Sequence, residues 1–163
     1  MSKTSKEIRA IAVFHGKIKG TVYFTETKNG DVEIELNLSG LKKNHSHGFH
    51  IHEYGDMSDQ CESMCAHFNP YGKTHGGPND TNRHVGDLGN INTDMNGNAT
   101  YTFTDSAIKL RGTKSNIIGR GLVIHADTDD LGHGDDKMSK ITGNAGKRIA
   151  CAVIGYARPN LKG

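Results

Sequence analysis

The sequence predicts an all-β protein, an antiparallel barrel or sandwich of eight short strands. Three observations predict it. In several segments hydrophobic and polar residues alternate with a period of two, which is typical of a strand with one buried face. The hairpin-turn dipeptides Asn29-Gly30 and Asn96-Gly97 lie beside such segments. Hydrophobic residues at helical spacing, by contrast, are scarce along the chain.

The clearest strands flank the first of these turns. Val22 and Phe24 alternate with their neighbours before it, and residues 32–38 place four aliphatic side chains on one face and three polar ones on the other. Six further segments complete the expected set in chain order: residues 10–15, 48–53, 87–91, 99–103, 121–125 and 148–156.

Two long segments, residues 54–85 and 126–147, do not fit ordinary connections between strands. Both are polar and rich in Gly, Asn and Asp. Structureless loops longer than about 12–15 residues are uncommon and are usually functional or disordered. The first contains His67, His75 and His84, so a bound metal would order it in place of a hydrophobic core. We expect these two loops to carry the function and the strands to serve as scaffold.

Composition excludes several classes of protein. The 163 residues suit one domain, and a net charge of +2 with scattered Lys and Arg argues against nucleic-acid binding. Residues 1–8 lack the hydrophobic core of a secretory signal, and no stretch reaches the length of a membrane-spanning helix. We therefore expect a cytoplasmic protein that binds neither membrane nor nucleic acid.

The histidines form the most informative pattern. His50 and His52 are two residues apart in an expected strand, so both imidazoles point to one side. Imidazole nitrogens suit copper and zinc, and a carboxylate is an accepted zinc ligand. The candidate ligands are His50, His52, His67, His75, His84, Asp87 and His125. Six histidines and one aspartate satisfy two metals only if one imidazole bridges them.

The strength of this signal differs between its parts. The pair His50 and His52 alone is weak, because strand histidines are more often hydrogen-bonded surface or core residues. The loop histidines with Asp87 are stronger, since four ligand types fall in a segment that is otherwise hard to stabilise. Structural zinc sites are usually rich in cysteine. This set contains no cysteine, and that absence favours a reactive metal.

Four histidines remain outside this set. His15, His45 and His133 lie in polar segments and are expected to be exposed. His47 is one residue out of phase with the ligand pair, so we expect a hydrogen-bonded structural role for it.

Five blocks of sequence together resemble the copper/zinc superoxide dismutase family, from about residue 10 to residue 157. They are Gly48-Phe49-His50-Ile51-His52-Glu53, His67-Phe68-Asn69-Pro70, His75-Gly76-Gly77-Pro78, Arg83-His84-Val85-Gly86-Asp87-Leu88-Gly89 and Gly143-Asn144-Ala145-Gly146. The resemblance implies an eight-stranded Greek-key barrel or flattened, immunoglobulin-like sandwich with two long functional loops. It also implies a domain at residues 9–158, between a flexible N-terminal segment (1–8) and a C-terminal tail (159–163).

The resemblance assigns roles to individual residues. It implies copper ligands His50, His52, His67 and His125, and zinc ligands His67, His75, His84 and Asp87. His67 would be the bridging imidazolate, and Asp129 would link His50 to His75. Arg148 would attract the substrate anion beside copper, with Thr142 on the channel wall. Cys61 and Cys151 would form the intrachain disulfide, although two reduced thiols remain an alternative in a reducing cytosol.

The implied reaction is the disproportionation of superoxide to dioxygen and hydrogen peroxide, an antioxidant defence, with copper cycling between oxidation states and zinc as a structural partner. His67 would carry a proton during the cycle. A homodimer is also implied, through a patch at Tyr54, Gly55, Ile118, Gly119 and residues 155–157, and a copper chaperone is a candidate partner. Two rivals are a metal-delivery protein, which would usually lack part of the copper set, and a zinc-only module, which would leave His50, His52 and His125 unexplained.

Some positions depart from the family pattern. Ile141 takes the place of a lysine in the substrate channel, and Lys137 and Lys140 are candidates to replace it. Tyr156 replaces a smaller aliphatic residue in the implied dimer patch, so the dimer geometry is expected to differ. Cys65 lies where glycine is common. We expect it to be a small buried core residue rather than a rival partner for Cys61 or for a metal.

Overall fold

Residues 7–160 are described by the computed structural model of the chain. Of the two expected terminal segments, residues 1–6 and 161–163 lie outside the described part. The first strand begins at Arg9 and the last ends at Tyr156. The domain bounds at residues 9–158 stay a prediction.

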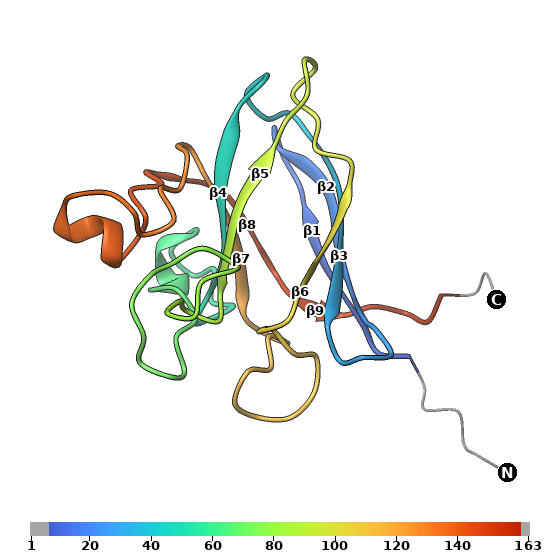
Figure 1. Cartoon of the computed structure of the whole chain (residues 1–163). Coiled ribbons are helices and arrows are strands. Elements are labelled where there is room, and N and C mark those ends of the chain that lie inside the picture. Colours follow the sequence, from blue (N-terminus) through green and yellow to red (C-terminus); the bar gives the residue numbers. More distant parts are fainter. Residues whose placement is uncertain (1–6, 161–163) are drawn as a thin grey trace, which may run out of the picture.

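Two antiparallel sheets face each other in a sandwich (Figure 1). The first has the order β6-β3-β2-β1-β9 and the second β5-β4-β7-β8. The strands are β1 (Arg9–Phe14), β2 (Lys19–Glu26), β3 (Val32–Ser39), β4 (Ser46–His52), β5 (Asp87–Asn92), β6 (Thr102–Asp105), β7 (Gly121–His125), β8 (Arg148–Val153) and β9 (Gly155–Tyr156). The predicted all-β antiparallel class is confirmed.

The hydrophobic core lies between the sheets and follows the alternation seen in the sequence. On β3, buried and exposed side chains alternate along the whole strand. Phe24 of β2 and Phe49 of β4 enter the core from opposite sheets, and both are fully buried. The turn between β2 and β3 contains Asn29-Gly30 as predicted, with Gly30 at φ +90°, a conformation that glycine adopts without steric cost.

Two strands differ from the sequence-based expectation. The expected strand at residues 148–156 divides, because the chain passes at Ile154 from the edge of one sheet to the edge of the other. Its end, β9, pairs with Ala10 and Ile11 of β1. The strand expected at residues 99–103 begins only at Thr102, and Ala99 forms an isolated bridge to Leu38 instead. The alternation of hydrophobic and polar side chains predicts neither change. It is the same for strands of either sheet and does not show which strand a segment pairs with.

The two long loops lie against the outer face of the β5-β4-β7-β8 sheet, away from the first sheet (Figure 1). Each contains one short 3-10 helix, η1 (Glu62–Met64) and η2 (Lys137–Lys140). Gly48 and Gly121 allow this close packing: a side chain on Gly48 would collide with Ala145, and one on Gly121 with Met64. Among the described residues, no helix has the length and hydrophobicity to cross a membrane.

Candidate metal centre

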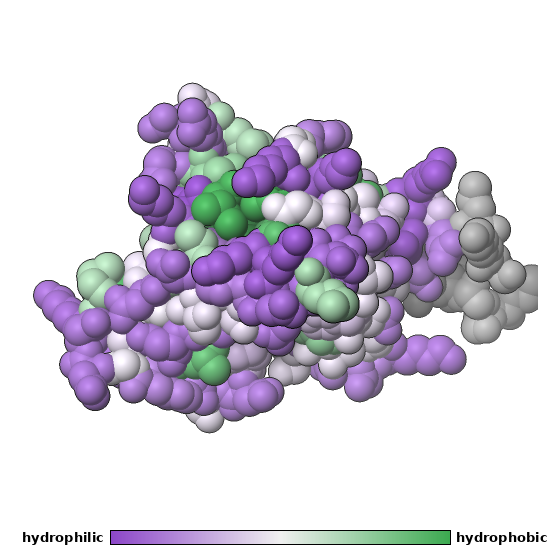
Figure 2. Space-filling model, turned by 90° about the horizontal axis from the view of Figure 1, so that it is seen from above, coloured by the Kyte–Doolittle hydropathy of each residue, from purple (hydrophilic) through white to green (hydrophobic). Residues whose placement is uncertain are grey.

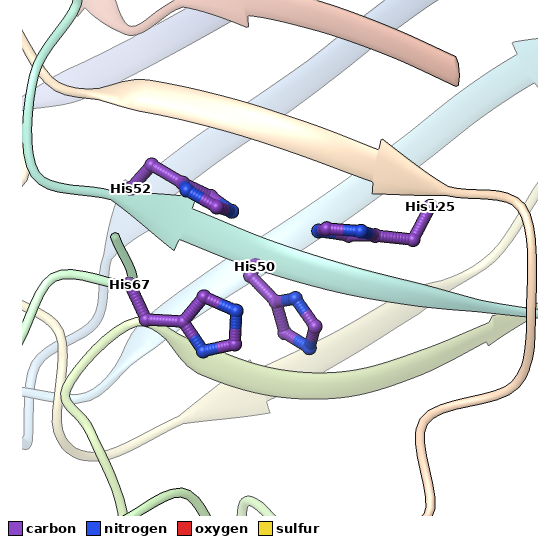
Figure 3. A group of neighbouring side chains, drawn as sticks. All are labelled: His50, His52, His67 and His125. Atoms are coloured by element: carbon purple, nitrogen blue, oxygen red, sulfur yellow. The ribbon is translucent and has the colours of Figure 1, made fainter. Parts of the chain in front are cut away.

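Strand alternation directs two histidines of β4 away from the core. Phe49 and Ile51 are fully buried between the sheets, so His50 and His52 lie on the outer face of the strand. β7 is the hydrogen-bonded neighbour of β4, and His125 at its end points into the same space (Figure 3). Three imidazoles therefore converge from two adjacent strands.

His67 reaches this space because the first loop pairs with the end of β4. The backbone N–H of Phe68 donates to the carbonyl of Ile51 at 2.8 Å, and that of Glu53 to the carbonyl of Ala66 at 2.9 Å. These bonds continue the sheet pattern on both sides of His67 and fix its position beside the strand.

The four-histidine cluster consists of His50, His52, His67 and His125 (Figure 3). One ring nitrogen of each lies within 4.8 Å of the others, and all four side chains are buried. Nδ1 of His50 and Nε2 of both His52 and His125 have no hydrogen-bond partner. Leaving buried polar atoms unpaired costs free energy. One metal ion would satisfy all of them, so the cluster fits a metal with imidazole ligands.

In these rings, the hydrogen bond made by one nitrogen determines which nitrogen is available to bind a metal. Nδ1 of His52 donates to the carbonyl of Cys65 at 2.7 Å, and Nδ1 of His125 to the carbonyl of Gly146 at 3.0 Å. A carbonyl oxygen only accepts, so Nδ1 carries the hydrogen and Nε2 keeps its lone pair. In His50 the roles are reversed, because Nε2 faces a carboxylate and Nδ1 is free. In each of the three rings one nitrogen is held by a hydrogen bond and the other keeps its lone pair. A metal-binding histidine needs this arrangement.

The Asp87 cluster is a second group, formed by His67, His75, His84 and Asp87. Oδ1 of Asp87 lies 3.0 Å from Nδ1 of His67 and of His75, and 3.2 Å from Nδ1 of His84. Oδ2 accepts the backbone N–H groups of His84 and Gly76 at 2.8 and 3.0 Å. These two bonds orient the carboxylate toward the imidazoles. Three nitrogens and one oxygen form a set that suits zinc.

His67 belongs to both clusters. Its Nδ1 faces Asp87, which leaves Nε2 for the four-histidine cluster. Its ring centroid lies 4.1 Å from that of His50 and 5.3 Å from that of His84. One imidazole therefore lies between the two candidate metal positions.

Asp129 connects the clusters a second time. Its Oδ2 lies 2.6 Å from Nε2 of His50, and its Oδ1 lies 2.8 Å from Nε2 of His75. Asn90 holds the backbone of Asp129 in place, accepting its N–H at 2.7 Å and donating to its carbonyl at 3.0 Å. A carboxylate in this position orients one ring of each cluster.

Burial and charge give the two clusters different proton affinities. Burial is the main cause of a lowered pKa in His50, His52, His67 and His125, in the last to about 4. Burial also opposes the charged ring of His75, but hydrogen bonds to Asp129 and Asp87 outweigh it and raise that pKa to about 9. The pKa of Asp87 is lowered despite its burial, because three imidazoles contact it. The four-histidine cluster is therefore neutral near pH 7, the form that binds metals.

A cavity of about 530 Å³ leads from the surface to the four-histidine cluster. Arg148 and Thr142 line it, together with Met138 and Ile141, which are each 46% exposed. Among the described residues of this wall, Arg148 carries the one permanent charge. Lys137 and Lys140, the candidate substitutes for a channel lysine, are exposed outside it.

Comparisons with known proteins agree with this geometry. The sequence model described as copper/zinc superoxide dismutase matches residues 18–154. The chain belongs to the copper/zinc superoxide dismutase family. It is 62% identical over 157 residues to the superoxide dismutase [Cu-Zn] of Paramecium bursaria Chlorella virus 1, covering 96% of this chain and 83% of that protein. It is 53% identical over 153 residues to that of Podospora anserina, covering 92% and 99%.

A solved structure, described as that of the clock protein EA4, resembles the fold with a TM-score of 0.88 and 45% identity. The match covers 95% of this chain and 98% of that one. As a copper/zinc superoxide dismutase, the chain is an oxidoreductase that converts superoxide to dioxygen and hydrogen peroxide, with copper and zinc as cofactors.

The cysteines of this superoxide dismutase are not all placed as expected. Cys61 and Cys151 form a disulfide with a Cα–Cα distance of 5.8 Å. The guanidinium of Arg148 donates to the carbonyl of Cys61 at 2.9 Å, so the bridge lies beside the cavity that leads to the four-histidine cluster. The prediction that Cys65 is buried is wrong: its side chain is exposed. Met64 takes the buried position, and Cys65 turns outward at φ +64° where η1 ends.

Sequence reasoning missed several residues that support the dismutase site. The carbonyl groups that orient His52 and His125 are main-chain atoms, which leave no signal in the sequence. Arg83 was also missed. It is buried, pairs with Asp105 at 2.7 Å and donates to the carbonyls of its neighbours His84 and Val85. It thereby ties the segment before the Asp87 cluster to the end of β6.

Proposed function

We propose that copper is held by His50, His52, His67 and His125, and that zinc is held by His67, His75, His84 and Asp87. The observation that carries this proposal is the position of His67, whose Nδ1 faces Asp87 while its ring packs against His50. Copper supplies a one-electron redox couple for superoxide, and zinc supplies a fixed charge without redox chemistry.

In this proposal His67 moves a proton. Its Nε2 takes up a proton during the half-cycle that releases dioxygen and gives it up during the half-cycle that forms peroxide. A second proton from water completes the balance: two superoxide ions and two protons give one dioxygen and one hydrogen peroxide. Nδ1 of His67 faces Asp87, so it would be the nitrogen held on the zinc side, and the ring would keep its orientation while Nε2 changes protonation.

Arg148 would bind the anion at the inner end of the cavity. Its guanidinium is anchored to the carbonyl of Cys61, and the other described side chains on the cavity wall carry no permanent charge. A single cation on the wall of a cavity concentrates the field on the substrate path. Thr142 lies on the same wall, where it would border the path of the anion.

We further propose that the protein is a homodimer that acts in the cytoplasm as an antioxidant defence. Exposed hydrophobic side chains support the dimer: Tyr54 is 50%, Val153 41% and Tyr156 67% exposed. Gly55 lies against Val153 and the carbonyl of Gly119, so these segments form one surface, and such patches mark protein interfaces. A chaperone would deliver copper to a centre this deeply buried.

The metal assignment is tested by His125→Ala. The variant is expected to fold and to retain zinc, because His125 is absent from the Asp87 cluster, but to lose copper and superoxide consumption. Metal content by plasma mass spectrometry and superoxide decay, before and after copper loading, give the result. His133→Ala, which removes an exposed histidine, is the matched control and should behave as wild type. Full copper content and activity in His125→Ala would refute the assignment.

A further inference from the structure

A second cavity, of about 590 Å³, opens at the end of the sandwich remote from β9. At the other end of the sandwich, β9 pairs only with Ala10 and Ile11 of β1. The later part of β1, up to Phe14, then has no strand partner on that side among the described residues. Phe14 and Ile149 of β8 are hydrophobic residues that line the opening. This end of the molecule faces the viewer in Figure 2, where hydrophobic side chains gather in a small area framed by hydrophilic ones.

His47 lines this cavity and is 1% exposed. It shares the inner face of β4 with Phe49 and Ile51, so it points away from the metal clusters. Five buried side-chain nitrogens in the described part of the chain have no hydrogen-bond partner. Four belong to the rings of the four-histidine and Asp87 clusters. The fifth is Nε2 of His47, for which the dismutase centre offers no explanation.

The bonding of His47 specifies what this nitrogen needs. Its Nδ1 donates to the carbonyl of His125 at 2.7 Å, so Nδ1 carries the hydrogen and Nε2 offers a lone pair. The ring of His45 packs edge-on against that of His47 at 4.6 Å and restricts its rotation. An occupant that donates an O–H or N–H group would satisfy Nε2.

The rim of the cavity is cationic. Lys17 and Lys42 line it and are exposed, as is His15. Neither lysine has an ion-pair partner within residues 7–160. None of the described lining residues is acidic. An anionic group at the rim would therefore meet two unpaired ammonium groups.

We propose that this cavity binds a small aromatic hydroxy acid. Its hydroxyl donates to Nε2 of the buried His47, its ring packs against Phe14 and Ile149, and its carboxylate reaches the exposed Lys17 and Lys42. A rigid aromatic ring suits the site because it keeps the hydroxyl and the carboxylate apart. The hydroxyl then reaches the buried His47 while the carboxylate stays at the exposed lysines. The volume is within the range of small-molecule sites, about 300–1,000 Å³.

The test uses the full chain with zinc and reduced, diamagnetic copper, titrated with 4-hydroxybenzoate and followed by NMR. Saturable shifts are expected in the His47 ring and the Ile18 and Ile149 methyl groups, with the signals of Arg148 unchanged. Benzoate lacks the hydroxyl and phenol lacks the carboxylate, so each should bind about tenfold more weakly. Absence of saturation at millimolar concentration, equal affinity for the three compounds, or shifts confined to Arg148 would each overturn the proposal.

A charge variant gives an independent result. Replacing both Lys17 and Lys42 by Gln is expected to weaken 4-hydroxybenzoate binding about fivefold and to leave phenol binding unchanged. Lys43→Gln, which removes a neighbouring exposed lysine outside the lining, is the matched control and should change neither. Unaltered 4-hydroxybenzoate affinity in the double variant would contradict the carboxylate position.

Discussion

Two buried carboxylates at the metal centre have different tasks. Asp87 faces three imidazoles with one oxygen, while backbone N–H groups of His84 and Gly76 hold the other. Asp129 instead contacts Nε2 of His50 and Nε2 of His75, and its Oδ1 also accepts the backbone N–H of Leu131. The first carboxylate is suited to bind metal, and the second to fix ring orientation. Their chemistry is identical, so only their surroundings distinguish them.

Arg148 is the residue that we propose to attract the substrate. Arg148→Glu is expected to lower the rate of superoxide consumption at low salt by about tenfold or more, because the single permanent charge on the described cavity wall changes sign. The normal loss of rate with rising salt should weaken or reverse. Stopped-flow decay of superoxide at several ionic strengths measures both effects.

Metal content provides the control for that variant, since Arg148 is in neither metal cluster. Copper and zinc should remain near wild-type amounts. Lys147→Glu alters an exposed neighbouring charge outside the cavity and should have a much smaller effect. Unchanged kinetics in Arg148→Glu would show that another group guides the anion.

At the scale of elements, the second long loop depends on one glycine that lies against Asp129. Gly143 has φ +70°, and a side chain there would collide with Oδ1 of Asp129 and Nε2 of His75. The loop can pass this close to the buried carboxylate only without a Cβ atom. Asn144 then bonds Asp130 and Asp136 and closes the loop around η2.

We therefore expect Gly143→Ala to displace Asp129 and to weaken metal binding about 10- to 100-fold. Gly112→Ala is the matched control: it has a similar φ of +80° but open space around the added carbon. Its backbone strain costs about 1 kcal/mol without changing metal affinity. Competition with a chelator measures the affinity of both variants. Equal metal affinities would mean that the loop adapts and that Gly143 has no such role.

Strands and ligand-bearing side chains were predictable from the sequence to different degrees. Alternation in β4 predicted that His50 and His52 share a face, because that rule is local. The carbonyls of Cys65 and Gly146 could not be predicted, because every residue has a carbonyl and only the folded loops bring these two to imidazoles. Cys65 was misplaced for a related reason: its exposure depends on where η1 ends.

At the scale of the molecule, the buried histidines make the metal-free protein sensitive to acid. A histidine whose pKa is lowered in the folded state stabilises the fold at pH values above 6.5, its pKa in the unfolded chain. That stabilisation is lost as the pH falls toward the pKa of the folded state. His125, with a pKa of about 4, alone should cost about 2 kcal/mol between pH 7 and pH 5. His75 behaves oppositely: its contribution is complete below pH 6.5 and is lost as pH rises through about 9.

Urea unfolding of the metal-free protein at pH 5, 7 and 9.5 measures these changes, and the free energy of unfolding should be highest at pH 7. The metal-loaded protein is the control. Bound metals occupy the lone pairs, so its stability should vary less between pH 7 and pH 5. A metal-free protein that is equally stable at pH 5 and pH 7 would contradict the prediction.

The proposed dimer is tested with a charge on its surface. Val153→Glu is expected to convert a dimer into monomers, because a buried unpaired carboxylate costs several kcal/mol. Met95→Glu changes a residue that is 70% exposed on a distant turn and should leave the dimer intact. Sedimentation velocity distinguishes the two masses. A wild-type protein that sediments as a monomer at micromolar concentration would exclude this interface.

The disulfide has a consequence for how the protein matures. Cys61 and Cys151 are 90 residues apart. The disulfide lowers the conformational entropy of the unfolded chain and thereby stabilises the folded state by roughly 4–5 kcal/mol. The carbonyl of Cys61 also anchors the guanidinium of Arg148. In a newly made chain that has bound its metals but in which Cys61 and Cys151 are still reduced, the guanidinium of Arg148 would be held less firmly. We therefore expect superoxide consumption to reach its full rate only after Cys61 and Cys151 have been oxidised to the disulfide.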